Sequence, residues 1–122
     1  HNPPWVDPET GRSFKQTLAD DGSFAPADAA RLAAAVRNFL ALVRKHNPHA
    51  VIVWAYGMLG SGLLLLLWDG LDQYRTVSGD ERVYLLELPE ARGDTIGARQ
   101  HPGAAAHRAA ANCLAEFLRS VL

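Results

Sequence analysis

Apolar positions recur at helical spacing from residue 26 to about residue 46. The intervals of three and four place them on one face of a helix, and they are Ala29, Leu32, Ala33, Val36, Phe39, Leu40 and Val43. Pro26 suits the first helical turn, and Asp28 suits the positive end of the helix dipole. The pattern therefore predicts a helix that begins at Pro26 and ends near His46, before an Asn-Pro pair.

Two short runs rich in β-branched and aromatic residues predict strands. The run AVIVWAY covers residues 50–56 and does not alternate between apolar and polar positions, which is typical of a strand covered on both faces. Gly57 and Gly60 interrupt it. The run RVYLLEL covers residues 82–88 and stops at Pro89, so it predicts a second strand.

Two more helices are predicted after the first strand. One covers about residues 62–76, with a single face formed by Leu64, Leu67, Trp68, Leu71 and Tyr74. The other covers about residues 102–122, with Pro102 in its first turn.

The order of these elements predicts an α/β fold with a parallel sheet. Residues 1–25 are rich in turn signals and predict a loop arm, whereas residues 26–122 read as helix, strand, helix, strand and helix. Two parallel strands cannot cover their own edges, and such sheets usually have about five or six strands. We therefore expect residues 1–122 to be the C-terminal part of one larger domain, or to pair with a second chain that supplies the missing strands.

Charge and cysteine content exclude several classes of protein. Twelve Lys and Arg against 13 Asp and Glu give a net charge of −1 without a basic stripe, so a nucleic-acid partner is not expected. The longest apolar run, LLLLLW at residues 63–68, is far shorter than the roughly 20 residues that span a bilayer. Cys113 is the single cysteine and lies in an apolar helical pattern, which favours a packed thiol over a reactive one.

A histidine follows the second strand at the position where α/β proteins bind ligands. His101 lies in the segment TIGARQHPGAAAH, at the end of the loop that leaves the strand, and ligands bind outside the carboxyl ends of the strands in open α/β sheets. Pro102 restricts the backbone directly after it. His101 is therefore a candidate general base, although a histidine before a helix is by itself more often a loop or cap residue.

Three segments together resemble a known family. The opening PPWVDPETG, the central FLALVRKHNPHAVIVWAYGMLG and the final RVYLLELPEARGDTIGARQHPGAAAHRAAANCLAEFL are similar to the C-terminal half of SGNH hydrolases, the GDSL-like lipase and acylhydrolase superfamily. Within it, the nearest likeness is to carbohydrate esterases that remove acetyl groups from sugars. The segment GARxHPG is the most specific part of the resemblance.

The resemblance implies a flavodoxin-like three-layer sandwich and a catalytic serine. It also implies a glycine and an asparagine that help to form the oxyanion hole, all from motifs earlier than this segment, so Asn2 is not assigned to that role. The catalytic histidine of the family corresponds to His101. Its Nε2 atom would take the serine proton during attack on the ester and return it to the leaving sugar oxygen.

One position departs from the common family pattern. Many SGNH enzymes place an aspartate three residues before the histidine, where this chain has Ala98. Three options remain open: a serine and histidine dyad oriented by a backbone carbonyl, an acid from elsewhere such as Asp94, or an inactive copy. The resembling carbohydrate esterases often lack the aspartate, which favours the dyad.

Other histidines and a serine have simpler interpretations. His107 is six positions after His101 and does not share its helix face, so a metal pair is not expected. His46 and His49 flank the end of a predicted helix and are interpreted as cap and turn residues. Ser61 lies between a strand and a helix but outside a G-x-S-x-G pattern, so we interpret it as a turn serine.

Aromatic and apolar residues near the strand end could line a substrate pocket. Tyr56 and Met58 fall at the carboxyl end of the first strand, and Trp5 lies in the arm. Aromatic faces suit sugar rings, but an aromatic at a strand end is more often part of the core.

The sequence therefore predicts part of a carboxylester hydrolase that acts on a small O-acylated, preferably O-acetylated, carbohydrate. The segment would supply the base and part of the pocket, and would be inactive alone because it lacks the nucleophile. No metal or organic cofactor is expected. The alternative is a noncatalytic carbohydrate-binding or scaffold fragment of the same fold, which Ala98 supports.

Overall fold

Two parallel strands form the centre of the molecule. In the computed structural model, which describes residues 5–6, 8–14, 21 and 23–122, strand β3 (Ile52–Gly57) pairs with strand β4 (Val83–Leu88). The register places Ile52 opposite Val83 and Gly57 opposite Leu88. Within the described residues, each of these two strands pairs only with the other.

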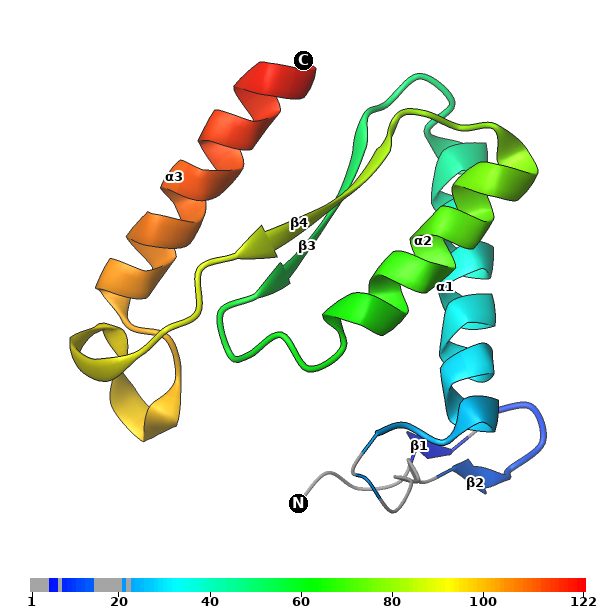
Figure 1. The fold of residues 1–122 in the computed structure, drawn as a ribbon, viewed down its shortest axis with the longest axis horizontal. Coiled ribbons are helices and arrows are strands. Elements are labelled where there is room, and N and C mark those ends of the chain that lie inside the picture. Colours follow the sequence, from blue (N-terminus) through cyan, green and yellow to red (C-terminus); the bar gives the residue numbers. More distant parts are fainter. Residues whose placement is uncertain (1–4, 7, 15–20, 22) are drawn as a thin grey trace.

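Helices cover both faces of this sheet. Helix α1 (Pro26–His46) and helix α2 (Leu64–Ser78) pack against each other on one face, and helix α3 (Ala104–Val121) lies on the other (Figure 1). The chain therefore has the α/β fold expected from its sequence, as part of a flavodoxin-like three-layer sandwich. The three predicted helices and two predicted strands between residues 26 and 122 are confirmed.

The main core lies between the sheet and the α1–α2 layer. Its most deeply buried side chains are Val36 and Leu40 of α1, Leu71 of α2 and Val83 of β4. On the opposite face of β4, the ring of Tyr84 meets that of Phe117 from α3 edge-on, with the ring centroids 5.6 Å apart. β4 is therefore covered on both faces, which explains its nearly uninterrupted apolar sequence.

Two aromatic residues predicted on buried helix faces are exposed instead. Phe39 is 53% exposed and touches Trp54 edge-on from the flank of α1, with ring centroids 5.5 Å apart. Trp68 is 49% exposed, because it lies about 100° around α2 from Leu67, on the flank of the buried stripe. The period of a helix identifies its apolar side but not how far the neighbouring layer extends around it.

The predicted starts of two helices are wrong by two residues. Helix α2 begins at Leu64 rather than near residue 62, and α3 begins at Ala104 rather than at Pro102. Pro102 instead forms an isolated antiparallel bridge with Ile96, so it belongs to the loop. The predicted loop arm also contains a short antiparallel pair, β1 (Trp5–Val6) and β2 (Ser13–Phe14).

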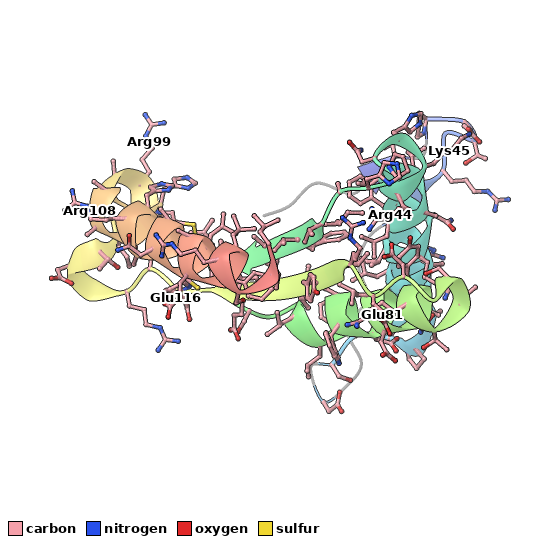
Figure 2. All side chains as sticks on the ribbon, turned by 90° about the horizontal axis from the view of Figure 1, so that it is seen from above. Arg44, Lys45, Glu81, Arg99, Arg108 and Glu116 are labelled. Carbon is pink, nitrogen blue, oxygen red and sulfur yellow. The ribbon has the colours of Figure 1, made fainter. Side chains whose placement is uncertain are left out.

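A charged network joins α1 to the amino-terminal ends of the strands. Arg44 Nε donates to Asp80 Oδ2 at 2.7 Å, its Nη1 donates to the Ala50 carbonyl at 2.6 Å, and the Tyr74 hydroxyl donates to Asp80 Oδ2 at 3.1 Å. Partial burial acts to raise the pKa of Asp80, but hydrogen bonds from Arg44, the Arg82 backbone and Tyr74 outweigh it and hold that pKa below its usual value. Figure 2 shows Arg44 at the end of the molecule opposite to Arg99, so this network is structural and lies away from the carboxyl ends of the strands.

No helix in the described part of the chain has both the length and the hydrophobicity needed to cross a membrane.

Candidate functional site

The loops that follow β3 and β4 meet at one edge of the sheet. The Ala91 N–H, just after β4, donates to the Met58 carbonyl, just after β3, at 2.8 Å. Gly57 ends β3 with φ of +139°, and a Cβ there would lie 2.5 Å from the Leu88 carbonyl oxygen. Only glycine permits both this backbone angle and this approach, so the sequence brings the two strand ends into direct contact.

Backbone strain is concentrated in these two loops. Among the described residues, the non-glycine residues with positive φ are Met58 at 65°, Arg99 at 55° and Gln100 at 63°. The Leu59 N–H donates to the Gly57 carbonyl at 2.8 Å, which makes Met58 the centre of a three-residue turn. A left-handed conformation costs a non-glycine residue about 1–2 kcal/mol. Strain of this kind is found at active sites and ligand clamps.

The backbone of His101 is held on both sides. Its N–H donates to the Ala98 carbonyl at 3.1 Å, and its carbonyl accepts the Gly97 N–H at 2.7 Å. His101 follows directly after the short 3-10 helix η2 (Ala98–Gln100), where two of the strained residues lie. The strained turn and the two hydrogen bonds therefore fix where the imidazole leaves the chain.

Two glycines close the base of this loop. A Cβ on Gly97 would lie 3.0 Å from the Gly103 Cα, and a Cβ on Gly103 would lie 3.0 Å from the Thr95 carbonyl oxygen. The Gly103 N–H also donates to that oxygen at 2.8 Å. Larger side chains would open the neck of the loop and move His101.

The segment that enters the loop has its own hydrogen bonds. The Arg92 N–H donates to Thr95 Oγ1 at 2.8 Å, and the Thr95 N–H donates to the Arg92 carbonyl at 3.1 Å, around the 3-10 helix η1 (Gly93–Thr95). The Arg92 side chain pairs with Glu90, which raises the pKa of Arg92. Both side chains are solvent-exposed, so this pair orders the loop entrance only weakly.

The side chain of His101 is exposed to solvent. Among the described residues, no hydrogen bond joins it to Asp94 or to any other side chain. Ala98, where many enzymes of the resembling superfamily carry an aspartate, is also exposed, and its carbonyl accepts the His101 backbone N–H rather than the ring. The described residues thus present an exposed histidine on a fixed backbone, with no hydrogen bond from its ring to an acidic side chain among them.

The three predicted pocket residues have different surroundings. Met58 is half-buried at the site and is joined to the loop that leads to His101. Tyr56 packs against the core on the α1–α2 face, and its hydroxyl accepts the Leu63 N–H at 3.3 Å. The backbone of Trp5 lies in β1, and its side chain lies outside the described structure. Met58 is therefore the pocket candidate that a hydrogen bond joins to the loop before His101.

Other side chains with nucleophilic or acid–base groups do not form a catalytic arrangement among the described residues. Ser61 is in an exposed turn, where its carbonyl accepts the Leu64 N–H at 2.9 Å. Cys113 is half-buried on α3, with Sγ 3.8 Å from the Glu87 carbonyl oxygen. His107 is exposed on α3. Within the described residues, no group of three His, Cys, Asp or Glu side chains could hold a metal ion.

Sequence reasoning missed the strained pair before the histidine. Arg99 and Gln100 carry no signal for positive φ, because glycine, asparagine and aspartate are the usual residues in that region. The two glycines six positions apart, Gly97 and Gly103, were the available signal for a closed loop.

The fold and this loop define an α/β protein with a clamped, exposed histidine beyond the carboxyl ends of parallel strands. No protein-family model and no curated protein sequence matches the chain. Among solved structures, the chain is similar to an acetyl xylan esterase, Est2A, from the rumen bacterium Butyrivibrio proteoclasticus, with 36% sequence identity and a TM-score of 0.88. The match covers 97% of this chain and 32% of the esterase, so the chain spans about a third of that protein's length.

Proposed function

We propose that this chain is the histidine-bearing part of an esterase that removes O-acetyl groups from carbohydrate. The similarity to Est2A supports this function, because it extends over nearly the whole chain at 36% identity. The observation that carries the proposal is His101, an exposed imidazole on a doubly clamped backbone beyond β4. The superfamily is proposed to be that of the SGNH hydrolases, on the strength of the GARxHPG segment.

In the proposed reaction, His101 moves one proton twice. Nε2 accepts the proton of a serine hydroxyl as the serine oxygen bonds to the ester carbonyl carbon. The bond between that carbon and the sugar oxygen then breaks, and Nε2 returns the proton to the sugar oxygen. Water hydrolyses the resulting acetyl-serine by the same route and releases acetate.

The serine and the donors that stabilise the oxyanion are proposed to come from the rest of the domain or from a partner chain. β3 has an edge without a strand partner in the described structure, where further parallel strands would continue the sheet. The carboxyl ends of such strands would meet the β3 and β4 loops at the same edge. Met58, Tyr56 and Trp5 are proposed to contribute to the pocket at that edge.

Among the described residues, no acidic side chain is hydrogen-bonded to the His101 ring, which favours a dyad over a triad. Asp94 and His101 are not hydrogen-bonded, and Ala98 cannot supply a carboxylate. A backbone carbonyl from the rest of the domain is the proposed partner of Nδ1. The same observation supports a second candidate, a noncatalytic carbohydrate-binding domain that keeps the fold without the chemistry.

Acetate release by the complete protein separates the two candidates. His101→Ala should lower hydrolysis of acetylated xylan by at least about a hundredfold, the lower range for loss of a general base, while far-ultraviolet circular dichroism stays the same. His107→Ala, a substitution of another exposed histidine, is the matched control and should retain activity. Equal turnover in the folded His101 variant would reject the assignment of the base, and an inactive wild type that binds sugar would favour the noncatalytic candidate.

A further inference from the structure

A groove runs along the flank of α2 beside β4. It consists of three hollows that share side chains: one of about 430 Å³ at the carboxyl end of β4, one of about 210 Å³ in the middle, and one of about 400 Å³ at the C-terminal end of α2. Glu87 lines the first two, and Trp68 lines the second and third. The hollows are therefore neighbours in a row, and the first lies at the sheet edge where the candidate site is.

The chemistry of the groove changes along its length. The middle is mostly apolar, with Glu87 as its one charged lining residue, and contains Leu65, which is 81% exposed, beside the half-exposed indole of Trp68. The two ends are polar, with Ser61 at one end and Asp72 and Arg75 at the other. Trp68, Asp72 and Arg75 follow one another at helical spacings of four and three, so they form one stripe on α2.

The polar groups of this stripe are available to a ligand. Within the described part of the chain, Asp72 and Arg75 make no hydrogen bond or ion pair, although they lie one turn apart. Arg75 offers donors, Asp72 offers acceptors, and Ser61 can act as either. An exposed indole between donors and acceptors matches a sugar chain, whose rings have apolar C–H faces and hydroxyl-bearing edges.

We propose that this groove binds further sugar units of a polysaccharide whose acetylated unit is held at the candidate site, with Trp68 as the stacking platform. The proposal rests on the proposed esterase function. Helix α2 has 15 residues and is about 22 Å long, so the groove extends well beyond a single sugar ring.

The edge of β4 favours a saccharide over an added strand from another chain. Glu87 is exposed in the strand, and Pro89 and Glu90 follow it directly. Charged side chains and proline at a sheet edge disfavour pairing with another strand. The open position beside β4 is therefore suited to a ligand that binds through side chains.

The first test compares long and short substrates. In the complete protein, Trp68→Ala should reduce the ratio of kcat/KM on acetylated xylan to kcat/KM on an acetylated monosaccharide by about tenfold, the effect expected for truncation of an aromatic anchor in an interface. Val77→Ala is the matched control, because Val77 is also on α2, is 85% exposed and lies on the opposite side of the helix. An unchanged ratio in Trp68→Ala would overturn the proposal that the groove binds sugar units.

A second test measures binding without catalysis. Titration of xylohexaose into the His101→Ala protein should give a Kd about tenfold lower than the Kd of the double variant His101→Ala, Trp68→Ala. Adding Trp68→Phe instead of Trp68→Ala should recover most of this difference in affinity. Equal affinities would overturn the proposal even if the enzyme is active. If the affinity for xylohexaose depends on Trp68 but the wild-type protein has no esterase activity, the result would support sugar binding in the groove and reject only the proposed catalytic function.

Discussion

Gly70 lies where α2 approaches α1 closely, and replacing it with alanine sets two effects against each other. Alanine is favoured over glycine in the middle of a helix by about 0.8–1.0 kcal/mol, so local propensity alone predicts stabilisation. A Cβ at this position, however, would lie 2.7 Å from Val36 Cβ, 2.9 Å from Val36 Cγ1 and 3.1 Å from the Ala33 carbonyl oxygen. Val36 is 1% exposed and, as a β-branched residue in a helix, has essentially one χ1 rotamer.

The steric effect should therefore exceed the propensity effect. Overpacking a close-packed core costs about 1–3 kcal/mol, so we expect Gly70→Ala to lower the free energy of unfolding by up to about 2 kcal/mol after the gain in propensity. Urea denaturation of the complete protein measures this difference. Gly62→Ala is the matched control, because a Cβ there meets nothing within 4 Å, and it should be neutral or slightly stabilising.

A double-mutant cycle with Val36→Gly identifies the cause. If the clash with Val36 dominates, the combined substitution should be less destabilising than the sum of the single ones by at least about 1 kcal/mol, a coupling typical of residues in contact. An increase in stability in Gly70→Ala, or strict additivity with Val36→Gly, would refute the packing of α1 on α2 described above.

Three further predictions concern the charged network, the site and the sheet edges. Asp80→Asn should lower the free energy of unfolding by about 1–3 kcal/mol at neutral pH, a value between those of surface and buried ion pairs. Because the pKa of Asp80 is lowered in the folded protein, this loss of stability should be present above the unfolded pKa of about 3.9 and should disappear as the pH falls through the folded pKa. A loss of stability that persists at low pH would contradict the role of the charge. Ala98→Asp should change acetate release by less than about tenfold, or ~1.4 kcal/mol in barrier, if a backbone carbonyl already orients His101; a gain of a hundredfold would contradict a working dyad. The isolated 122 residues should associate in size-exclusion chromatography with light scattering, since β3 and β4 each have an edge without a strand partner among the described residues, and a stable monomer with protected strand amides would count against this view.

The regular elements could be predicted because their signals are local. Pro26 and the Asn-Pro pair after His46 bound α1 in the sequence as they do in the structure, and the two apolar runs correspond to β3 and β4. The apolar period places Trp68 on the buried face of its helix, but in the structure it is half-exposed. Whether a residue at the flank of the apolar face is covered depends on how far the neighbouring layer extends, which is a tertiary property.

The candidate site was less accessible from sequence. The order of elements places the loop before His101 at the carboxyl end of a strand, but the role of the histidine comes from the family resemblance. The positive φ angles of Met58, Arg99 and Gln100 have no counterpart in residue type, because glycine, asparagine and aspartate are the usual residues in that region.

Covalent labelling tests most directly whether His101 activates a serine from outside this chain. A fluorophosphonate ester should modify one serine in the complete protein, and peptide mass spectrometry should locate it outside residues 1–122. His101→Ala should slow this labelling by at least about a hundredfold, whereas His107→Ala should leave its rate unchanged. Labelling of Ser61, or labelling at the same rate without the His101 imidazole, would contradict the proposed catalytic role.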